Sequence, residues 1–214
     1  MGRSLRWVSW LVSIACLCTV AQAEDHSVHA GVPVPIVVFS AFTCPYCAEA
    51  SKMLDQLQAK YPGKVNVIFK HFPLGTDRAA YLPHEAALAA GEQGRFWEMH
   101  DKLYAHQQSL DQKAVEQIAA ELKLDMTAFR TALEQRRYLA RIDSDVAEAQ
   151  AFKVVATPTF YIDGFKLEGL QQAATFEQII EHRLGKASAQ GDGFQGFVGA
   201  NKPSTMSFPG KARQ

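Results

Sequence analysis

The stretch that decides the fold is residues 39–50, FSAFTCPYCAEA, in which two residues separate Cys44 from Cys47. A nearly continuous apolar run, PIVVFSAF at residues 35–42, leads into it, which is typical of a strand buried on both faces of a sheet. Apolar residues then recur at helical spacing as far as the turn-forming Pro-Gly pair at residues 62–63. The pattern predicts a strand followed by a helix, with Cys44 at the helix N-terminus.

The composition predicts an ordinary globular protein of one domain, or one domain with an insertion. The chain has 214 residues, 48% of them hydrophobic, and its 22 basic residues balance its 22 acidic ones. A formal net charge of zero gives no overall field that would attract nucleic acid or an anionic membrane. Nucleic acid is therefore not expected as a partner.

The N-terminus has the pattern of an export signal. Two arginines precede an apolar run at residues 7–20, and AQA at residues 21–23 fits a small-x-small cleavage site. The run is shorter than the roughly 20 residues that span a bilayer. We predict that residues 1–23 are a removed signal peptide and that the protein is periplasmic. Cys16 and Cys18 would leave with it, so that Cys44 and Cys47 would be the only thiols.

A second strand and a long helical region follow the first helix. KVNVIFKHFPL, at residues 64–74, alternates as a strand does, and strand-helix-strand order predicts a parallel pair. Residues 77–150 are rich in Ala, Glu, Gln and Leu and predict a helical insertion. We expect helix starts near Pro83, at a capping box formed by Ser109 and Gln112, and after Asp125. Three aromatic residues of the insertion are predicted to pack in its core: Phe96, Trp97 and Tyr104.

The C-terminal third begins with strands. TPTFYIDGFKL, at residues 157–167, contains Asp163-Gly164 between two β-rich runs, which is a strong hairpin signal. A last helix is expected from Thr175, capped with Gln178, to Gly185. Beyond it, residues 186–214 are glycine- and serine-rich without periodicity, and predict a disordered tail.

Three kinds of chemistry use a Cys-x-x-Cys pair. A structural zinc site needs about four ligands, and only His71 or His84 could join the cysteines. A structural disulfide over so short a loop would contribute little stability. A redox pair explains the position as well, because a helix N-terminus stabilises the Cys44 thiolate and Cys47 then lies one turn away to resolve a mixed disulfide.

Three segments together resemble the DsbA-like branch of the thioredoxin-fold thiol–disulfide oxidoreductases: FTCPYC, KHFPL and VVATPTFYIDG. The resemblance covers roughly residues 33–184. It implies an α/β thioredoxin fold with a helical insertion domain, formed by residues 24–76 and 151–185 with the insertion at 77–150. It also implies protein thiols and disulfides as substrates, a membrane redox partner and no cofactor or metal.

The same resemblance assigns roles to six residues. Cys44 and Cys47 would be catalytic, and Pro45 and Tyr46 would complete the active-site motif. Thr157 and Pro158 would form the substrate-binding platform, with a cis peptide bond between them.

Three departures leave the net direction of electron flow open. Tyr46 replaces the histidine typical of DsbA-type oxidases, Val38 replaces a buried acid, and Thr157 replaces valine. These residues resemble those of the DsbC and DsbG isomerases. About ten residues lie between Glu24 and the first strand, too few for the dimerisation domain of those isomerases, so a monomer is expected.

Two further hypotheses concern single residues. Because Val38 occupies the position of the buried acid, we expect Lys70 or water to assist the deprotonation of Cys47. The alternative interpretation of Lys70 is a solvated residue at the end of a strand. Cleavage after Ala23 would expose Glu24-Asp25-His26, whose amine, amides and imidazole could bind Cu(II) in a square plane. Copper handling is therefore an alternative function for the protein. The simpler interpretation is that these residues form a terminus without function.

Overall fold

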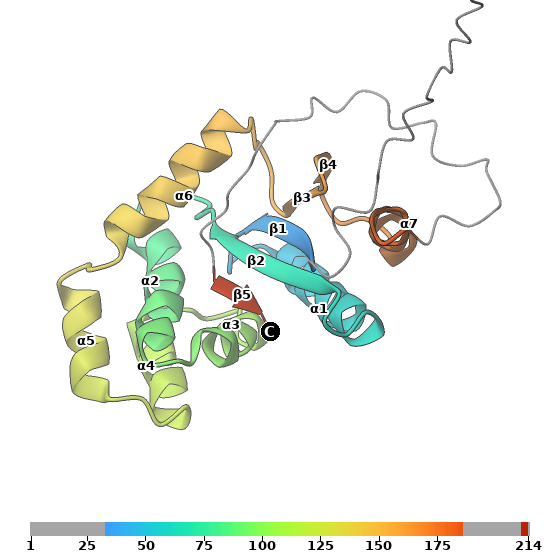
Figure 1. Cartoon of the computed structure of the whole chain (residues 1–214). Helices are drawn as coiled ribbons and strands as arrows, with labels where there is room; N and C mark the ends of the chain where they lie inside the picture. The colour runs from blue at the N-terminus through green and yellow to red at the C-terminus, as the bar shows by residue number, and fades with distance from the viewer. Residues whose placement is uncertain (1–32, 186–210, 214) are drawn as a thin grey trace, which may run out of the picture. The chain divides into compact units, whose positions relative to one another are not determined.

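The computed structural model describes residues 33–185 and the main chain of residues 211–213 (Figure 1). The predicted signal peptide, the Glu24-Asp25-His26 copper site and all but three residues of the predicted disordered tail lie outside the described residues, so these remain predictions. None of the helices in the described parts is both long enough and apolar enough to cross a membrane.

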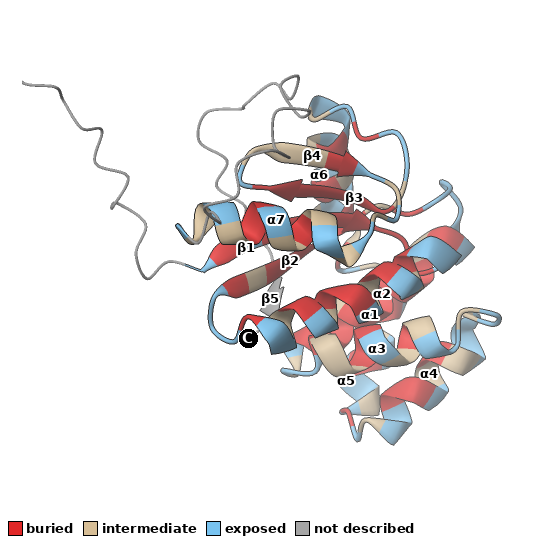
Figure 2. Ribbon diagram, turned by 90° about the vertical axis from the view of Figure 1, so that its right-hand side faces the viewer, coloured by how far each residue is buried: buried red, intermediate tan, exposed pale blue. Residues whose placement is uncertain are grey.

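A five-stranded sheet with the order β4-β3-β1-β2-β5 forms the centre of the fold. The strands are β1 (Val34–Ser40), β2 (Val65–His71), β3 (Thr159–Ile162), β4 (Phe165–Glu168) and β5 (Lys211–Arg213). The pairing of β1 with β2 is parallel, as the strand-helix-strand order predicts, and the other three pairings are antiparallel. In Figure 2, β1 and β3 are coloured almost entirely as buried.

Helices cover both faces of this sheet. Helices α1 (Pro45–Lys60) and α7 (Ala173–Arg183) share one hydrophobic cluster with Val38 of β1 and Phe69 of β2. The neighbouring strand residues face the other way and form a second cluster with Ala149 of the insertion. This alternation follows from the period of two along a strand, and it decides which side chains can reach the cysteines.

Five helices fill the stretch between β2 and β3: α2 (Arg78–Glu92), α3 (Phe96–Ala105), α4 (Gln112–Glu121), α5 (Met126–Glu134) and α6 (Leu139–Ala151). Figure 1 shows α2 to α5 gathered together beside the sheet. A thioredoxin fold with a helical insertion, the predicted fold class, is confirmed. The exact domain boundaries stay a prediction.

Several predicted helix starts are wrong. Pro83 lies inside α2, which begins five residues earlier because the Asp77 side chain accepts a hydrogen bond from the Ala80 N–H at 2.8 Å. Asp111, not Ser109, caps α4 in the same way. Helix α7 begins at Ala173, before the predicted Thr175, and has no side-chain cap.

Other turn predictions are confirmed. Asp125 caps α5 with hydrogen bonds from two N–H groups. Asp163 and Gly164 join β3 to β4 with φ of 48° and 86°, the positive angles that a two-residue hairpin loop requires. The tail prediction is wrong at Lys211–Arg213, because these residues pair with β2 as a strand at the edge of the sheet.

Candidate active site

The Cys-x-x-Cys pair lies at the start of α1. Cys44 is the N-cap residue, Pro45 is the first helical residue, and the Cys47 N–H donates to the Cys44 carbonyl oxygen at 3.1 Å. Proline fits the first helical position because its missing N–H would have no partner there. Cys44 is 5% exposed and Cys47 is 0% exposed, and neither forms a disulfide here. The two thiols therefore differ in access, with Cys44 the outer one.

The chain brings Thr157 and Pro158 to the outer cysteine. The Thr157–Pro158 peptide bond is cis, as the resemblance implies. The Cys44 thiol donates to the Thr157 carbonyl oxygen at 3.5 Å, across 113 residues of sequence. Tyr46, the remaining motif residue, is 60% exposed and leaves its ring on the surface beside the pair.

Burial controls the inner thiol. It raises the pKa of Cys47 to about 12, an effect that hydrogen bonds from the Ser40 side chain and the Ala41 main chain partly oppose. A thiol with so high a pKa is almost entirely protonated at neutral pH. Cys47 can become a nucleophile only if a neighbouring group or water removes its proton.

A side chain from the insertion holds the loop before α1. The Gln107 amide donates to the carbonyl oxygens of Phe42 at 2.6 Å and Cys44 at 2.9 Å. One amide thus fixes the main chain on both sides of Thr43. The insertion therefore positions the active-site loop directly.

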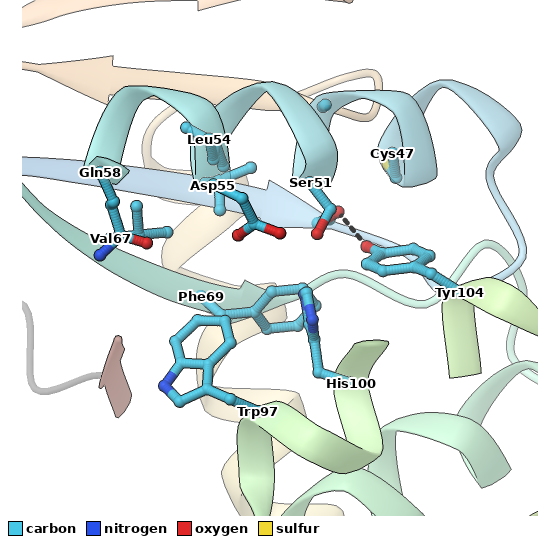
Figure 3. Close-up of a pocket in the computed structure, with 13 residues that line it drawn as sticks. Cys47, Ser51, Leu54, Asp55, Gln58, Val67, Phe69, Trp97, His100 and Tyr104 are labelled. Atoms are coloured by element: carbon cyan, nitrogen blue, oxygen red, sulfur yellow. Dashed lines mark hydrogen bonds between the residues drawn. The ribbon is translucent and has the colours of Figure 1, made fainter. Parts of the chain in front are cut away.

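A small pocket lies behind Cys47, between α1 and α3 (Figure 3). Its polar lining includes Ser40, Asp55 and Tyr104, and the Tyr104 hydroxyl lies 2.7 Å from the Ser40 hydroxyl. Sequence reasoning missed this site. The prediction of core packing holds for Phe96, which is 2% exposed, but Tyr104 also carries a polar contact at the pocket.

The hypothesis that Lys70 assists Cys47 is wrong. Lys70 pairs with Phe39 across β1 and β2, and both side chains lie on the sheet face opposite α1. Its ammonium is buried and contacts Asp145 at 3.3 Å and Glu148 at 2.7 Å, both on α6. Lys70 is also not a solvated strand-end residue, since its side chain is 1% exposed.

The two histidines considered as zinc ligands contact each other instead. The Nδ1 atoms of His71 and His84 are 2.9 Å apart. Burial lowers the pKa of both, that of His84 to about 3, so the pair is neutral at physiological pH. Within the described residues, no group of three or more His, Cys, Asp or Glu side chains could hold a metal ion.

The sequence profile of a thioredoxin family matches residues 29–182, which include the cysteine pair and the cis proline. The chain belongs to the thioredoxin family. The match runs through the insertion as well as both halves of the sheet.

Curated relatives share this region as part of longer chains. The Na(+)/H(+) antiporter NhaA 3 of Salinispora tropica is 36% identical over 179 residues, which are 80% of this chain and 27% of the antiporter. The NhaA 1 antiporter of Salinispora arenicola is 39% identical over 151 residues, 67% of this chain and 23% of that protein. The chain thus spans about a quarter of the length of these relatives.

Solved structures share the fold. A thioredoxin-like oxidoreductase from Silicibacter pomeroyi superimposes with a TM-score of 0.64 at 24% identity, covering 71% of this chain and 87% of that one. Alpha-DsbA1 of Wolbachia pipientis gives 0.65 at 21% identity, covering 73% and 88%. BdbD of Bacillus subtilis gives 0.64 at 20% identity, covering 72% and 89%. The predicted resemblance to DsbA-like proteins is confirmed in the fold.

Proposed function

We propose that the protein is an exported thiol–disulfide oxidoreductase that exchanges disulfides with periplasmic or secreted proteins. One observation carries the proposal. A near-surface thiol at a helix N-terminus contacts the main chain beside a cis proline, and a second, fully buried thiol lies one helical turn behind it. This arrangement suits a nucleophile and a resolving residue, not a metal clamp or a structural bridge.

In the reducing direction, the Cys44 thiolate attacks one sulfur of a client disulfide. A Cys44–client disulfide forms, and the other client sulfur leaves as a thiolate and takes a proton from water. Cys47 then loses its proton and attacks the Cys44 sulfur. The Cys44–Cys47 disulfide forms, the client bond breaks, and two electrons have passed to the client. The oxidising direction is the reverse of these steps.

The main chain at Thr157 and Pro158 is the proposed substrate platform. The Thr157 carbonyl oxygen already meets the Cys44 sulfur, so a client segment lying along this main chain would present its sulfur to Cys44. The Pro158 carbonyl oxygen accepts from the Gly169 N–H at 2.8 Å, which anchors the platform to the chain after β4.

The direction of exchange, the location and the partners complete the proposal. Disulfide donation to clients is the first alternative, and isomerisation or reduction of the DsbC or DsbG kind is the second. Export rests on the sequence of residues 1–23, and a membrane redox partner rests on the family resemblance. A monomeric state stays the expectation of the sequence analysis.

The test follows client disulfides in both directions. Oxidised protein is mixed with a reduced unfolded client, and reduced protein with a client that carries non-native disulfides. We expect client disulfides to form or rearrange faster than in buffer in at least one mixture, because the site supplies both thiols. Protein with both cysteines alkylated is the control. Rates equal to the control in both mixtures would contradict the proposal, and the mixture that responds identifies the direction.

A further inference from the structure

The proton of Cys47 has to leave a site whose Cys44 side is covered by the attached client. This problem follows from the proposed function, since Cys47 attacks only while a client is attached to Cys44. Cys47 is 0% exposed, and the attached client covers the surface around Cys44. A route for the proton therefore has to start on the far side of Cys47.

Two cavities that share lining residues lie on that side. The pocket behind Cys47 has a volume of about 10 Å³, which is room for about one water molecule. A cleft of about 410 Å³ lies between α1 and α3, where Lys52, Asp101 and Ala105 are among its lining residues. Both cavities are lined by the same three residues, Ser51, Asp55 and Tyr104. These three residues form the junction between the inner thiol and the cleft.

Asp55 is the acid at this junction. Cys47, Ser51 and Asp55 follow at intervals of four residues, so they lie along one face of α1. Figure 3 shows the Asp55 carboxylate pointing into the space between α1 and α3, and one of its oxygens is buried. Asp55 is about 12 Å along the helix from Cys47, too far for direct transfer, and Ser51 lies halfway between them.

We propose that the Cys47 proton leaves through the cleft between α1 and α3, along Ser51 and bridging water, and that Asp55 is the relay residue that accepts it. The step balances: Asp55 accepts the Cys47 proton, the Cys47 sulfur attacks the Cys44 sulfur, and the Cys44–client bond breaks as the client sulfur leaves as a thiolate. Asp55 then passes the proton to water in the cleft. Asp55, on α1, thereby accepts the proton that a buried acid would accept at the position that Val38 occupies in β1.

Other charged or titratable groups face the same space. Burial raises the pKa of Tyr104 well above its ordinary value, so this phenol keeps its proton at neutral pH. His100 of α3 lines the pocket, and its Nδ1 is 2.8 Å from the Asp101 carboxylate. Lys52 lines the cleft from α1. Among the described strand side chains, the pocket is lined by Val38, Ser40, Val67 and Phe69, and none of these titrates.

The experiment separates the two chemical steps. Reduced protein reacts with an aromatic disulfide that releases a coloured thiolate, once when Cys44 attacks and again when Cys47 resolves the mixed disulfide. For Asp55→Asn we expect an unchanged first release and a second release slowed about a hundredfold at neutral pH, the low end of general acid–base contributions. The variant should also lose the low-pH inflection of the second rate, while Asp55→Glu retains it.

Controls make each outcome decisive. Glu49→Gln removes an exposed carboxylate from the same helix and should change neither release. An unchanged first release shows that Asp55→Asn is folded at the site. A second release at the wild-type rate in Asp55→Asn would overturn the relay. His100→Gln is measured in the same way, and a second release that is slowed in this variant but not in Asp55→Asn would also overturn it. A wild-type protein that never gives the second release would instead contradict the proposed function.

Discussion

Substitution of Cys44 by serine will lower disulfide exchange to the rate seen in buffer alone. A serine hydroxyl is not a thiolate nucleophile at neutral pH, and Cys47 is the one other cysteine among the described residues. Cys47 cannot take over, since it is fully buried and burial raises its pKa to about 12. The measurement is the initial rate of exchange with a disulfide-bonded client.

Cys47→Ser is the matched control for this prediction. It removes the same atom one helical turn away but leaves the outer nucleophile, so the variant should accumulate a mixed disulfide between Cys44 and the client. Non-reducing electrophoresis detects that species. Residual exchange in Cys44→Ser, or a client attached to that variant, would show that the roles of the two cysteines are assigned wrongly.

Lys70→Met will lower the free energy of unfolding by about 3 kcal/mol. Lys70 and Asp145 are each 1% exposed, and removal of one partner leaves the other charge buried without full compensation. Arg141 also contacts Asp145, at 3.3 Å, so we expect the lower end of the usual cost of about 3–5 kcal/mol. Denaturant unfolding of the reduced protein measures the change.

Lys60→Met tests whether this effect comes from burial. The Lys60–Glu177 pair is 2.7 Å long, but Lys60 is 51% exposed, so its loss should cost less than about 1 kcal/mol. Equal losses in the two variants would contradict a buried ion pair at Lys70. The second release of the coloured thiolate should be normal in Lys70→Met, because Lys70 faces away from Cys47.

Periodic and turn patterns predicted much of the fold. The apolar run before Cys44 and the alternation after residue 64 predicted the parallel pair, and Asp163-Gly164 predicted the hairpin. Helix starts were predicted less well, because several neighbouring residues have side chains that suit the N-cap or the first helical turn. In α2 the Asp77 cap and the burial of Leu82 and the residues that follow it outweigh the preference of Pro83 for a first turn.

The candidate site was predictable only where its residues form a motif in the sequence. Cys44 and Cys47 share one helical turn, and the family pattern indicates Pro158. Gln107 and Tyr104 reach the loop and Ser40 from more than 60 residues away, so no local pattern could reveal them. Lys70 was misjudged because a strand's alternation gives two faces without saying which one α1 covers.

The most direct test of the central claim is a redox titration of the purified protein. Samples equilibrate in glutathione buffers of graded potential, are quenched in acid, and are alkylated with a reagent that shifts their mass. We predict that Cys44 and Cys47 change together, from both alkylated to neither, as one two-electron couple. Two cysteines that react independently with glutathione, with no internal disulfide at any potential, would contradict the account.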